Sequence, residues 1–327
     1  MNWHVRVVSF FIVLLFAGFA FYYFRLYVSP KKHGVILFVV PGTSAEVLRE
    51  ASAKRLDALA QANQTALVQI DAHDDYASLM TRVASGRLGK QRQLGLDAAG
   101  RRLDTLLYRA QRKHRSVGVV STGSLTSPGV AAFFSHVKNA FEIDLVALNI
   151  LDSTDMDVVL GGGEQAFAEA YRNHERDLFK EAEQKGYDIV RNKKELEDLQ
   201  AWMPKNLLGV FPKIENSFRV APIENVPVLA DLTRRAIQKL QYHLGGYFLI
   251  IEHELVARAA PDEAFEEIIE LDNAVNTALA YAGKNALVMV FFPASEIGWV
   301  FLYGEKVPDI QNLVTPAMLH DFIANEL

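Results

Sequence analysis

The stretch SVGVVSTGSLTSPGVAAFFSHV, residues 116–137, carries the pattern on which the fold prediction rests. It begins with an apolar run at 116–121, passes through a segment of Ser, Thr and Gly, and continues with a helical pattern that opens at Pro128. Proline is favoured in the first turn of a helix, because its missing N–H would have no partner there. The stretch therefore predicts a buried strand, a turn and a helix over residues 128–139.

Similar apolar runs recur on both sides of this stretch, separated by amphipathic segments. Most are continuously apolar, which is typical of strands covered on both faces, as in a parallel sheet between helices. Helical patterns fill the intervals, for example at 102–114 and from Asp262 onward. We therefore predict an α/β fold, a three-layer α/β/α sandwich around a large, mainly parallel sheet. The predicted strands are 34–40, 65–70, 116–121, 141–148, 156–162, 186–190, 206–211, 246–252, 286–292 and 300–304.

The composition excludes several classes of protein. The 327 residues are 50% hydrophobic and 22% charged, which is the balance of a globular chain. The net charge of −5 gives no general attraction to phosphate backbones, so we expect no nucleic-acid partner. The chain has no cysteine, which excludes disulfides, thiolate metal sites and a cysteine nucleophile.

Basic residues gather in one segment, since residues 82–115 contain ten Lys and Arg against two Asp. Two interpretations are open. The segment is either an ordinary solvated helix face or a docking patch for an anionic partner or lipid headgroup. Aromatic side chains are sparse there, which disfavours single-stranded nucleic acid.

The amino-terminal segment at residues 7–24, VVSFFIVLLFAGFAFYYF, contains no charged residue. As a helix it would be about 27 Å long, close to the ~30 Å hydrocarbon thickness of a bilayer. We predict a single transmembrane anchor there. A cleaved signal peptide is the alternative, because Gly18 to Ala20 forms a small-x-small site, although the apolar run continues to Phe24.

Segments spread along the chain resemble the alkaline phosphatases, and they follow one another in that family's order. The clearest are GVILFVVPG at 34–42, SVGVVSTGSLTSPGVAAFFSHV at 116–137, DVVLGGGEQAF at 157–167, GYFLIIE at 246–252 and LDNAVNTALAYA at 271–282. The resemblance covers essentially the whole chain after the apolar amino-terminal segment.

The resemblance implies a domain organisation and a location. Residues 34–327 would form one alkaline-phosphatase-like domain that lacks the family's late insertion, which would fall between Gly298 and Trp299. Residues 1–33 would hold a cytoplasmic stub, the anchor at about 7–24 and a short linker. We expect a single-pass protein of the cell membrane with a periplasmic body, although the charges flanking the anchor do not decide its orientation.

The family's chemistry, as the resemblance implies it, uses a serine nucleophile, two zinc ions, one magnesium ion and a phosphate-clamping arginine. This chain departs from that pattern. Pro41 occupies the position of a metal-bridging aspartate, and Tyr76 that of the nucleophile, after a retained Asp75. The clamp position is Ala140, and Lys138 is the nearest cation.

The remaining ligand positions differ as well. Ser127 and Gly129 correspond to positions that place oxygen ligands or orient water in the family, and Glu252 is a retained acidic residue. The aspartate and histidine zinc ligands that should follow Glu252 are replaced by Ala257 and Pro261. The Asp-His pair after the next strand is replaced by Ala294 and Ser295.

These replacements predict a pseudoenzyme with a dismantled zinc and serine centre, retained for binding or assembly in the cell envelope. We expect no cofactor. Asp75, Glu252 and His253 are weak metal candidates, since His253 should point away from its acidic neighbours on a strand. The alternative is a divergent metal-dependent phosphomonoesterase in which these three residues hold one magnesium ion.

We expect the membrane and an unidentified envelope protein as partners. A homodimer stays an open alternative, because the family forms dimers but the absent insertion normally contributes to that interface.

Overall fold

The structure is a computed structural model, and its chain divides into two compact units, residues 1–31 and 32–327. It describes residues 3–27, 33–42, 61–153, 155–200, 205–211, 225–255, 261–305 and 307–327. The first unit contains the helix α1 (Trp3–Tyr27), on which large hydrophobic side chains such as Phe10 and Leu15 are exposed. Within the described part of the chain, no helix reaches the length and apolarity of a membrane span.

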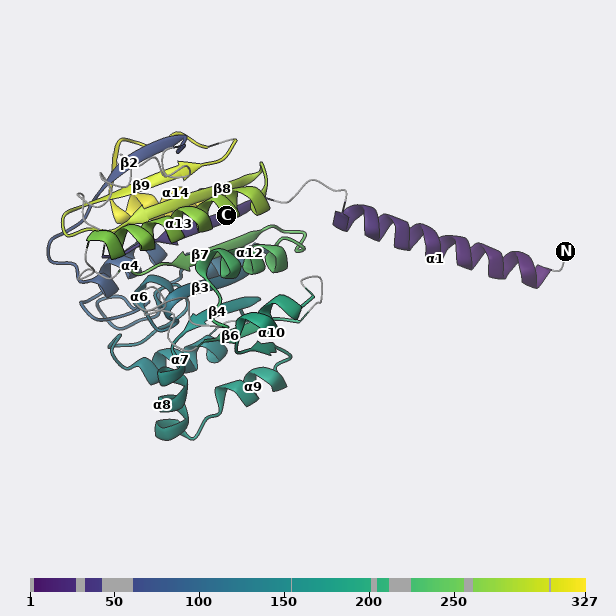
Figure 1. The fold of residues 1–327 in the computed structure, drawn as a ribbon, viewed down its shortest axis with the longest axis horizontal. Coiled ribbons are helices and arrows are strands. Elements are labelled where there is room, and N and C mark those ends of the chain that lie inside the picture. The colour runs from purple at the N-terminus through teal and green to yellow at the C-terminus, as the bar shows by residue number, and fades with distance from the viewer. Residues whose placement is uncertain are drawn as a thin grey trace. The chain divides into compact units, whose positions relative to one another are not determined.

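In the described residues of the second unit, ten strands form one sheet (Figure 1). The strand order is β10-β2-β9-β8-β1-β7-β3-β4-β6-β5, and neighbours are parallel except that β9 runs antiparallel to β2 and β8. The predicted α/β fold with a large, mainly parallel sheet is therefore confirmed. The strands are β1 (Gly34–Val39), β2 (Gln64–Gln69), β3 (Ser116–Ser124), β4 (Val158–Gly162), β5 (Asp188–Val190), β6 (Leu207–Val210), β7 (Tyr247–Glu252), β8 (Ala286–Phe292), β9 (Ile297–Tyr303) and β10 (Leu313–Val314).

The side chains of a strand alternate between the two faces of a sheet, and every residue of β1 is buried. Both faces of the sheet are therefore covered, and helices provide the cover. Leu37 of β1 belongs to a core with the helices α4 to α9 and α14, whereas Phe38 belongs to a core with α10, α12 and α13. The helices of the first core are α4 (Tyr76–Ser85), α5 (Leu106–Arg112), α6 (Pro128–Ala131), α7 (Ile143–Asp152), α8 (Glu164–His174), α9 (Leu178–Gln184) and α14 (Pro316–Glu326). Those of the second are α10 (Lys193–Asp198), α12 (Leu229–Leu240) and α13 (Pro261–Ala282).

The predicted strand at 141–148 is wrong, because this stretch lies mostly in α7. Phe141, Ile143 and Leu145 alternate with two acidic residues as in a half-buried strand, and the apolar run at 145–148 is too short to distinguish a strand from a helix. The buried residues of α7 have helical spacing: they are Val146, Ala147, Ile150 and Leu151.

The predicted helix at 128–139 is much shorter in the structure, where α6 ends within one turn. The carbonyl oxygens of Phe133 and Phe134, both fully buried, accept hydrogen bonds from the side chains of Thr105 and Tyr108. These tertiary hydrogen bonds take the place of the backbone bonds that a longer helix would need.

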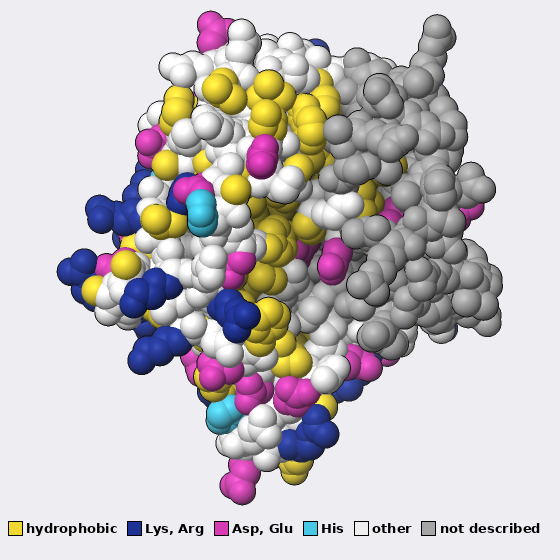
Figure 2. Space-filling model, turned by 90° about the vertical axis from the view of Figure 1, so that its left-hand side faces the viewer, with side chains coloured by type: hydrophobic (Ala, Val, Ile, Leu, Met, Phe, Trp, Pro, Cys, Tyr) yellow, Lys and Arg dark blue, Asp and Glu magenta, His cyan; other side chains and the backbone are white. Residues whose placement is uncertain are grey.

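The central parallel strands all end at one edge of the sheet, where loops and helix starts converge. This edge lies on the left of Figure 1, and Figure 2 faces it directly. Figure 2 shows hydrophobic side chains along the middle of this face, with acidic and basic side chains around them. The family positions at the ends of β1, β7 and β8 therefore lie on a single face.

Candidate functional site

A buried carboxylate at the end of β7 organises this edge of the sheet. Glu252 is fully buried, and its Oε1 accepts hydrogen bonds from Tyr76 Oη and Ser127 Oγ, each at 2.7 Å. The Oγ of Ser121 donates to Oε2 at 3.4 Å. The structure thus joins the start of α4, the residue before α6 and two strand ends around one side chain.

The close approach of α6 to this carboxylate requires glycine at position 129. A Cβ atom there would lie 2.1 Å from Glu252 Oε1 and 2.5 Å from Tyr76 Oη. Any larger residue would displace one of these groups. Gly129 therefore packs against the carboxylate and has no side-chain donor to offer a metal ion.

Burial controls the protonation of the two central groups. It raises the pKa of Glu252 to about 7, although hydrogen bonds from Ser127, Tyr76 and the backbone of Gly129 favour the charged form. The pKa of Tyr76 lies well above its ordinary value, first because of burial and then because of the charge of Glu252. Tyr76 is therefore a neutral phenol that donates a hydrogen bond.

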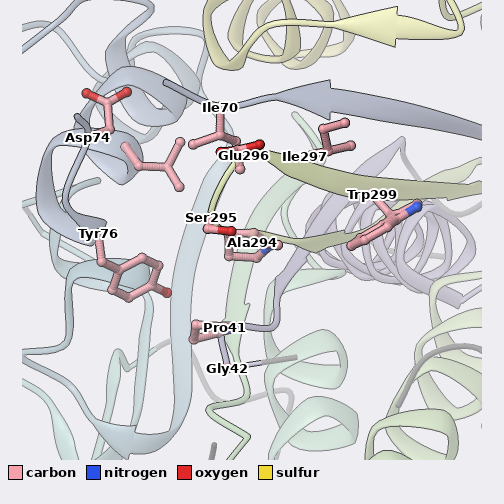
Figure 3. A pocket seen from close by; sticks show the side chains of 12 residues that line it. Pro41, Gly42, Ile70, Asp74, Tyr76, Ala294, Ser295, Glu296, Ile297 and Trp299 are labelled. Carbon is pink, nitrogen blue, oxygen red and sulfur yellow. The ribbon is translucent and has the colours of Figure 1, made fainter. Parts of the chain in front are cut away.

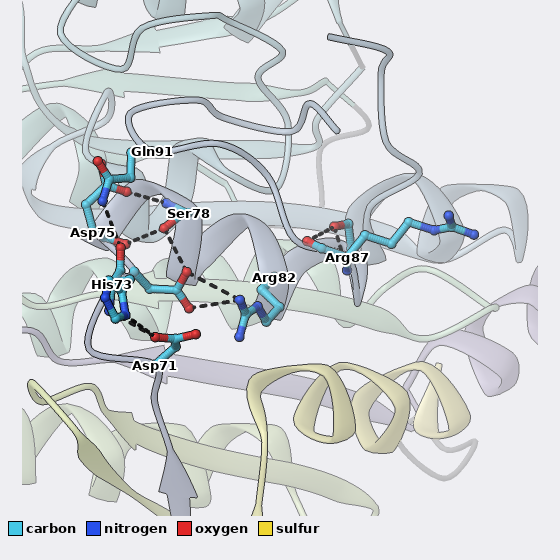
Figure 4. A network of polar contacts seen from close by, with 9 residues as sticks. Asp71, His73, Asp75, Ser78, Arg82, Arg87 and Gln91 are labelled. Carbon is cyan, nitrogen blue, oxygen red and sulfur yellow. Dashed lines mark hydrogen bonds and ion pairs between the residues drawn. The ribbon is translucent and has the colours of Figure 1, made fainter. Parts of the chain in front are cut away.

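Asp75 acts as the amino-terminal cap of α4. Its Oδ1 accepts the backbone N–H of Ser78 at 2.8 Å, and its Oδ2 accepts the backbone N–H of Arg92 at 2.6 Å. Figure 4 shows Asp75 at the start of the helix beside Ser78. Both carboxylate oxygens thus serve the backbone, as capping aspartates commonly do.

The neighbouring acidic residues of this loop form polar contacts, one of them an ion pair with Arg82 (Figure 4). The carboxylate of Asp74 lies 3.2 Å from Nη2 of Arg82, and Ser78 Oγ also donates to it. Asp71 Oδ1 lies 3.1 Å from Nδ1 of His73. These contacts fix the loop between β2 and α4.

His253 follows Glu252 and is buried on the other side of the strand. Its Nε2 lies 3.0 Å from the carbonyl oxygen of Glu267, and its Nδ1 lies 3.1 Å from Thr122 Oγ1. A carbonyl only accepts, so Nε2 carries the proton and Nδ1 accepts from the threonine. Burial lowers the pKa of His253 to about 4, so the imidazole is neutral at neutral pH.

An open cleft of about 730 Å³ lies beside this cluster, and we call it the strand-end cleft. Figure 3 shows Tyr76 on one side of it and Trp299 on the other, with Pro41, Ala294 and Ser295 between them. The lining residues are Pro41, Gly42, Ile70, Asp74, Tyr76, Leu79, Pro293, Ala294, Ser295, Glu296, Ile297 and Trp299. Four of these are positions that the family resemblance singled out: Pro41, Tyr76, Ala294 and Ser295.

Comparison with known proteins identifies the family. The sequence profile described as alkaline phosphatase matches residues 42–295, well over half of the chain. The chain belongs to the alkaline phosphatase family. Two curated relatives illustrate the similarity: alkaline phosphatase 4 of Bacillus subtilis (strain 168) is 26% identical over 265 residues, which are 77% of this chain and 56% of that protein. The alkaline phosphatase of Escherichia coli (strain K12) is 28% identical over 287 residues, or 72% and 61% of the two chains. The chain therefore spans little more than half the length of these relatives.

Solved structures of alkaline phosphatases share the fold. The enzyme from the Antarctic bacterium TAB5 superposes with a TM-score of 0.71 and 19% identity, covering 90% of this chain and 98% of that one. The enzyme from Thermus thermophilus gives a TM-score of 0.70 with 22% identity, covering 81% and 60%.

The described side chains at this edge of the sheet do not converge on a metal ion. Two zinc ions and one magnesium ion need several converging His and carboxylate donors. Here Asp75, Glu252 and His253 are each occupied by hydrogen bonds to different partners. Among the described residues, no group of three or more His, Asp or Glu side chains is arranged to hold a metal ion.

Among the described residues, the clamp position and its neighbouring cation do not line the cleft. Ala140 is buried, and its N–H donates to the carbonyl oxygen of Arg92, whereas Lys138 is exposed. Ala257 lies outside the described residues. Pro261 is described only as the first residue of α13. Neither position can therefore be placed relative to the site.

Sequence reasoning missed several residues that complete the site. Ser121 and Thr122 lie within β3, where Ser121 forms a hydrogen bond with Glu252 and Thr122 forms one with His253. The available signal in the sequence was the presence of polar residues at the end of an apolar run. Arg92, whose N–H binds Asp75, carries no such signal, because its left-handed backbone (φ 62°) depends on the surrounding loop.

We predict that Glu252→Gln changes the pH dependence of stability. The raised pKa means that the folded chain binds this proton more tightly than the unfolded chain between pH 4.5 and about 7. The contribution of protonated Glu252 to the unfolding free energy is therefore fully present below pH 4.5 and is lost as the pH rises through about 7. The glutamine side chain of the variant would stay neutral at every pH. As the pH rises from about 5 to about 8, the unfolding free energy of the variant should therefore increase by roughly 2–3 kcal/mol relative to that of the parent.

Urea unfolding at a series of pH values measures this difference. Glu183→Gln, at an exposed position of α9, is the matched control and should follow the parent at every pH. If the unfolding free energies of the parent and of Glu252→Gln changed with pH in parallel, the folded chain would not bind the Glu252 proton more tightly than the unfolded chain, and the prediction would be wrong.

We predict that Asp75→Ala lowers the unfolding free energy by about 1–2 kcal/mol, because two backbone N–H groups lose their acceptor. Asp321→Ala, at an exposed position of α14, should change it by less than about 0.5 kcal/mol. Denaturant unfolding with chelator and with added zinc provides the measurement. A loss that occurs only with zinc present would instead make Asp75 a metal ligand.

Proposed function

We propose that this protein is a non-catalytic member of the alkaline phosphatase family, retained for binding or assembly in the cell envelope. One observation carries the proposal. The residue at the nucleophile position, Tyr76, donates its hydroxyl proton to Glu252 in a buried hydrogen bond of 2.7 Å. Burial and the charge of Glu252 raise the pKa of this phenol well above its ordinary value, so it stays protonated and is a poor nucleophile at neutral pH.

The donors around Glu252 offer a physical substitute for a cation. A buried carboxylate is costly unless its oxygens are hydrogen-bonded or paired with positive charge. The hydroxyl groups of Tyr76, Ser127 and Ser121 supply such hydrogen bonds without any positive charge. This arrangement supports a role in which the family fold persists although its metal-dependent chemistry is lost.

The electrostatics of the strand-end cleft also disfavour phosphoryl transfer. Its described lining residues include two carboxylates, Asp74 and Glu296, and no Lys, Arg or His. Phosphoryl transfer depends on positive charge around the transferring group, whether from arginine, lysine or metal ions. A phosphomonoester dianion would be repelled here, so we propose that the cleft serves binding of another kind.

We further propose that the amino-terminal segment anchors the protein in the cell membrane, with the α/β unit on the periplasmic side. The uncharged run at residues 7–24 supports this, as do the exposed hydrophobic side chains along α1. An envelope protein would then be the partner, and dimerisation of the α/β unit is open to measurement by sedimentation.

The proposed non-catalytic function predicts a purified protein with substoichiometric zinc by elemental analysis and no turnover of p-nitrophenyl phosphate. Added zinc and magnesium should not restore activity, because several ligand positions carry side chains without a metal-binding donor: Pro41, Ala257, Pro261 and Ala294. Alkaline phosphatase 4 of Bacillus subtilis, assayed under the same conditions, is the positive control. Metal-dependent turnover that both Asp75→Ala and Glu252→Ala abolish would overturn the proposal in favour of a divergent hydrolase.

The anchoring proposal predicts that the chain stays with membranes during alkaline carbonate extraction. Replacing both Leu14 and Leu15 by Arg should release it, since each arginine at a helix centre costs about 2.5–3.5 kcal/mol on insertion. Leu88→Arg, at an exposed position of the α/β unit, is the control and should leave extraction unchanged. Release of the parent protein would count against an anchor, and a shortened amino terminus by mass spectrometry would indicate signal cleavage.

A further inference from the structure

The strand-end cleft combines an apolar floor with uncompensated negative charge. Most of its lining is apolar, with Ile70, Leu79 and Ile297 among the contributing side chains. Its volume of about 730 Å³ is within the range of clefts that hold small organic ligands. Such a cleft favours a ligand with an apolar body rather than a small, fully hydrated ion.

The charge in this cleft is concentrated at Glu296, which precedes β9. In the described part of the chain its carboxylate has no hydrogen bond or ion pair, and the residue is exposed, whereas Asp74 is paired with Arg82. Glu296 also lines an adjoining hollow of about 730 Å³ that contains Asp71 and Arg82, and Arg82 is the cation already paired with Asp74. An unpaired carboxylate between two hollows favours a positively charged group.

Aromatic rings lie at both ends of the same cleft. Figure 3 shows Tyr76 at one end, and Trp299 beyond Ile297 at the other. Trp299 is partly exposed, and indole is the aromatic side chain that attracts an organic cation most strongly. A carboxylate and an indole in one cleft are the combination that recognises ammonium and guanidinium groups with attached carbon.

We propose that the strand-end cleft binds an organic cation with an apolar body, held by Glu296 and Trp299. The inference rests on the proposed non-catalytic function and names its ligand class. It reverses the charge preference of a phosphatase cleft, because the positive charge that attracts phosphate is missing and carboxylates remain. A single divalent metal ion is disfavoured, since Glu296 lacks converging partners among the described residues.

Isothermal titration of the full-length chain in a non-ionic detergent tests this inference. The probes share a benzyl body and differ in charge: benzyltrimethylammonium, neutral benzyl alcohol and benzylphosphonate. We expect the ammonium to bind at least about fivefold more tightly than the alcohol, with an affinity that falls as salt rises. The phosphonate should bind more weakly than the alcohol.

Two variants assign the site. Glu296→Lys should weaken binding of the ammonium at least about fivefold and strengthen binding of the phosphonate, whereas Glu183→Lys on α9 should match the parent. Glu296→Gln, which changes the side chain least, should give an intermediate loss, and circular dichroism verifies that each variant is folded.

The outcomes separate this inference from the proposed function. Equal binding of the ammonium and the alcohol, or an unchanged affinity in Glu296→Lys, would overturn the cation site. If the same preparation lacks zinc and turnover, the non-catalytic function would still stand. Preferential binding of the phosphonate together with zinc-dependent turnover would overturn both.

Discussion

The candidate site is built around the buried carboxylate of Glu252. This residue ends a strand at the middle of the sheet, where water does not reach it, so its oxygens must find donors within the protein. Tyr76 and Ser127 supply them and thereby tie the start of α4 and the residue before α6 to β7. The cluster holds together three segments that are far apart in the sequence.

Under the proposed non-catalytic function, the same region would explain how the family fold persists without the family's chemistry. Metal ions would neutralise and cross-link the strand ends in a catalytic member, whereas neutral hydroxyl donors and a helix cap perform the cross-linking here. The capping role of Asp75 and the neutral, doubly bonded imidazole of His253 follow from the same requirement for satisfied buried groups. The described hydrogen bonds at this edge of the sheet therefore satisfy its buried polar groups with protein partners alone.

The charges that line the strand-end cleft bear on what it can recognise. With no basic side chain among its described lining residues, the field around Glu296 is negative, and the exposed surface is largely apolar. Glu296 and Trp299 lie close together in the sequence, but their distance from Tyr76 and Pro41 along the chain is large. The order β9-β8-β1-β7 places the segments that carry them around one cleft.

The fold class could be read from the amino-acid pattern alone, since continuous apolar runs separated by amphipathic segments are best buried as strands between two helical layers. The identities at the family positions, including Pro41, Tyr76 and Ser127, could be read in the same way. The pattern could not separate the helix at α7 from a strand, because its first residues alternate apolar and acidic side chains and the apolar run that follows is short. Which polar groups meet became known only from the folded chain. The hydrogen bond from Tyr76 to Glu252 joins residues 176 positions apart, and Arg92 meets Asp75 through a left-handed backbone that no local pattern requires. Such contacts depend on strand order and on the desolvation of each group, and both arise only when the whole sheet is assembled.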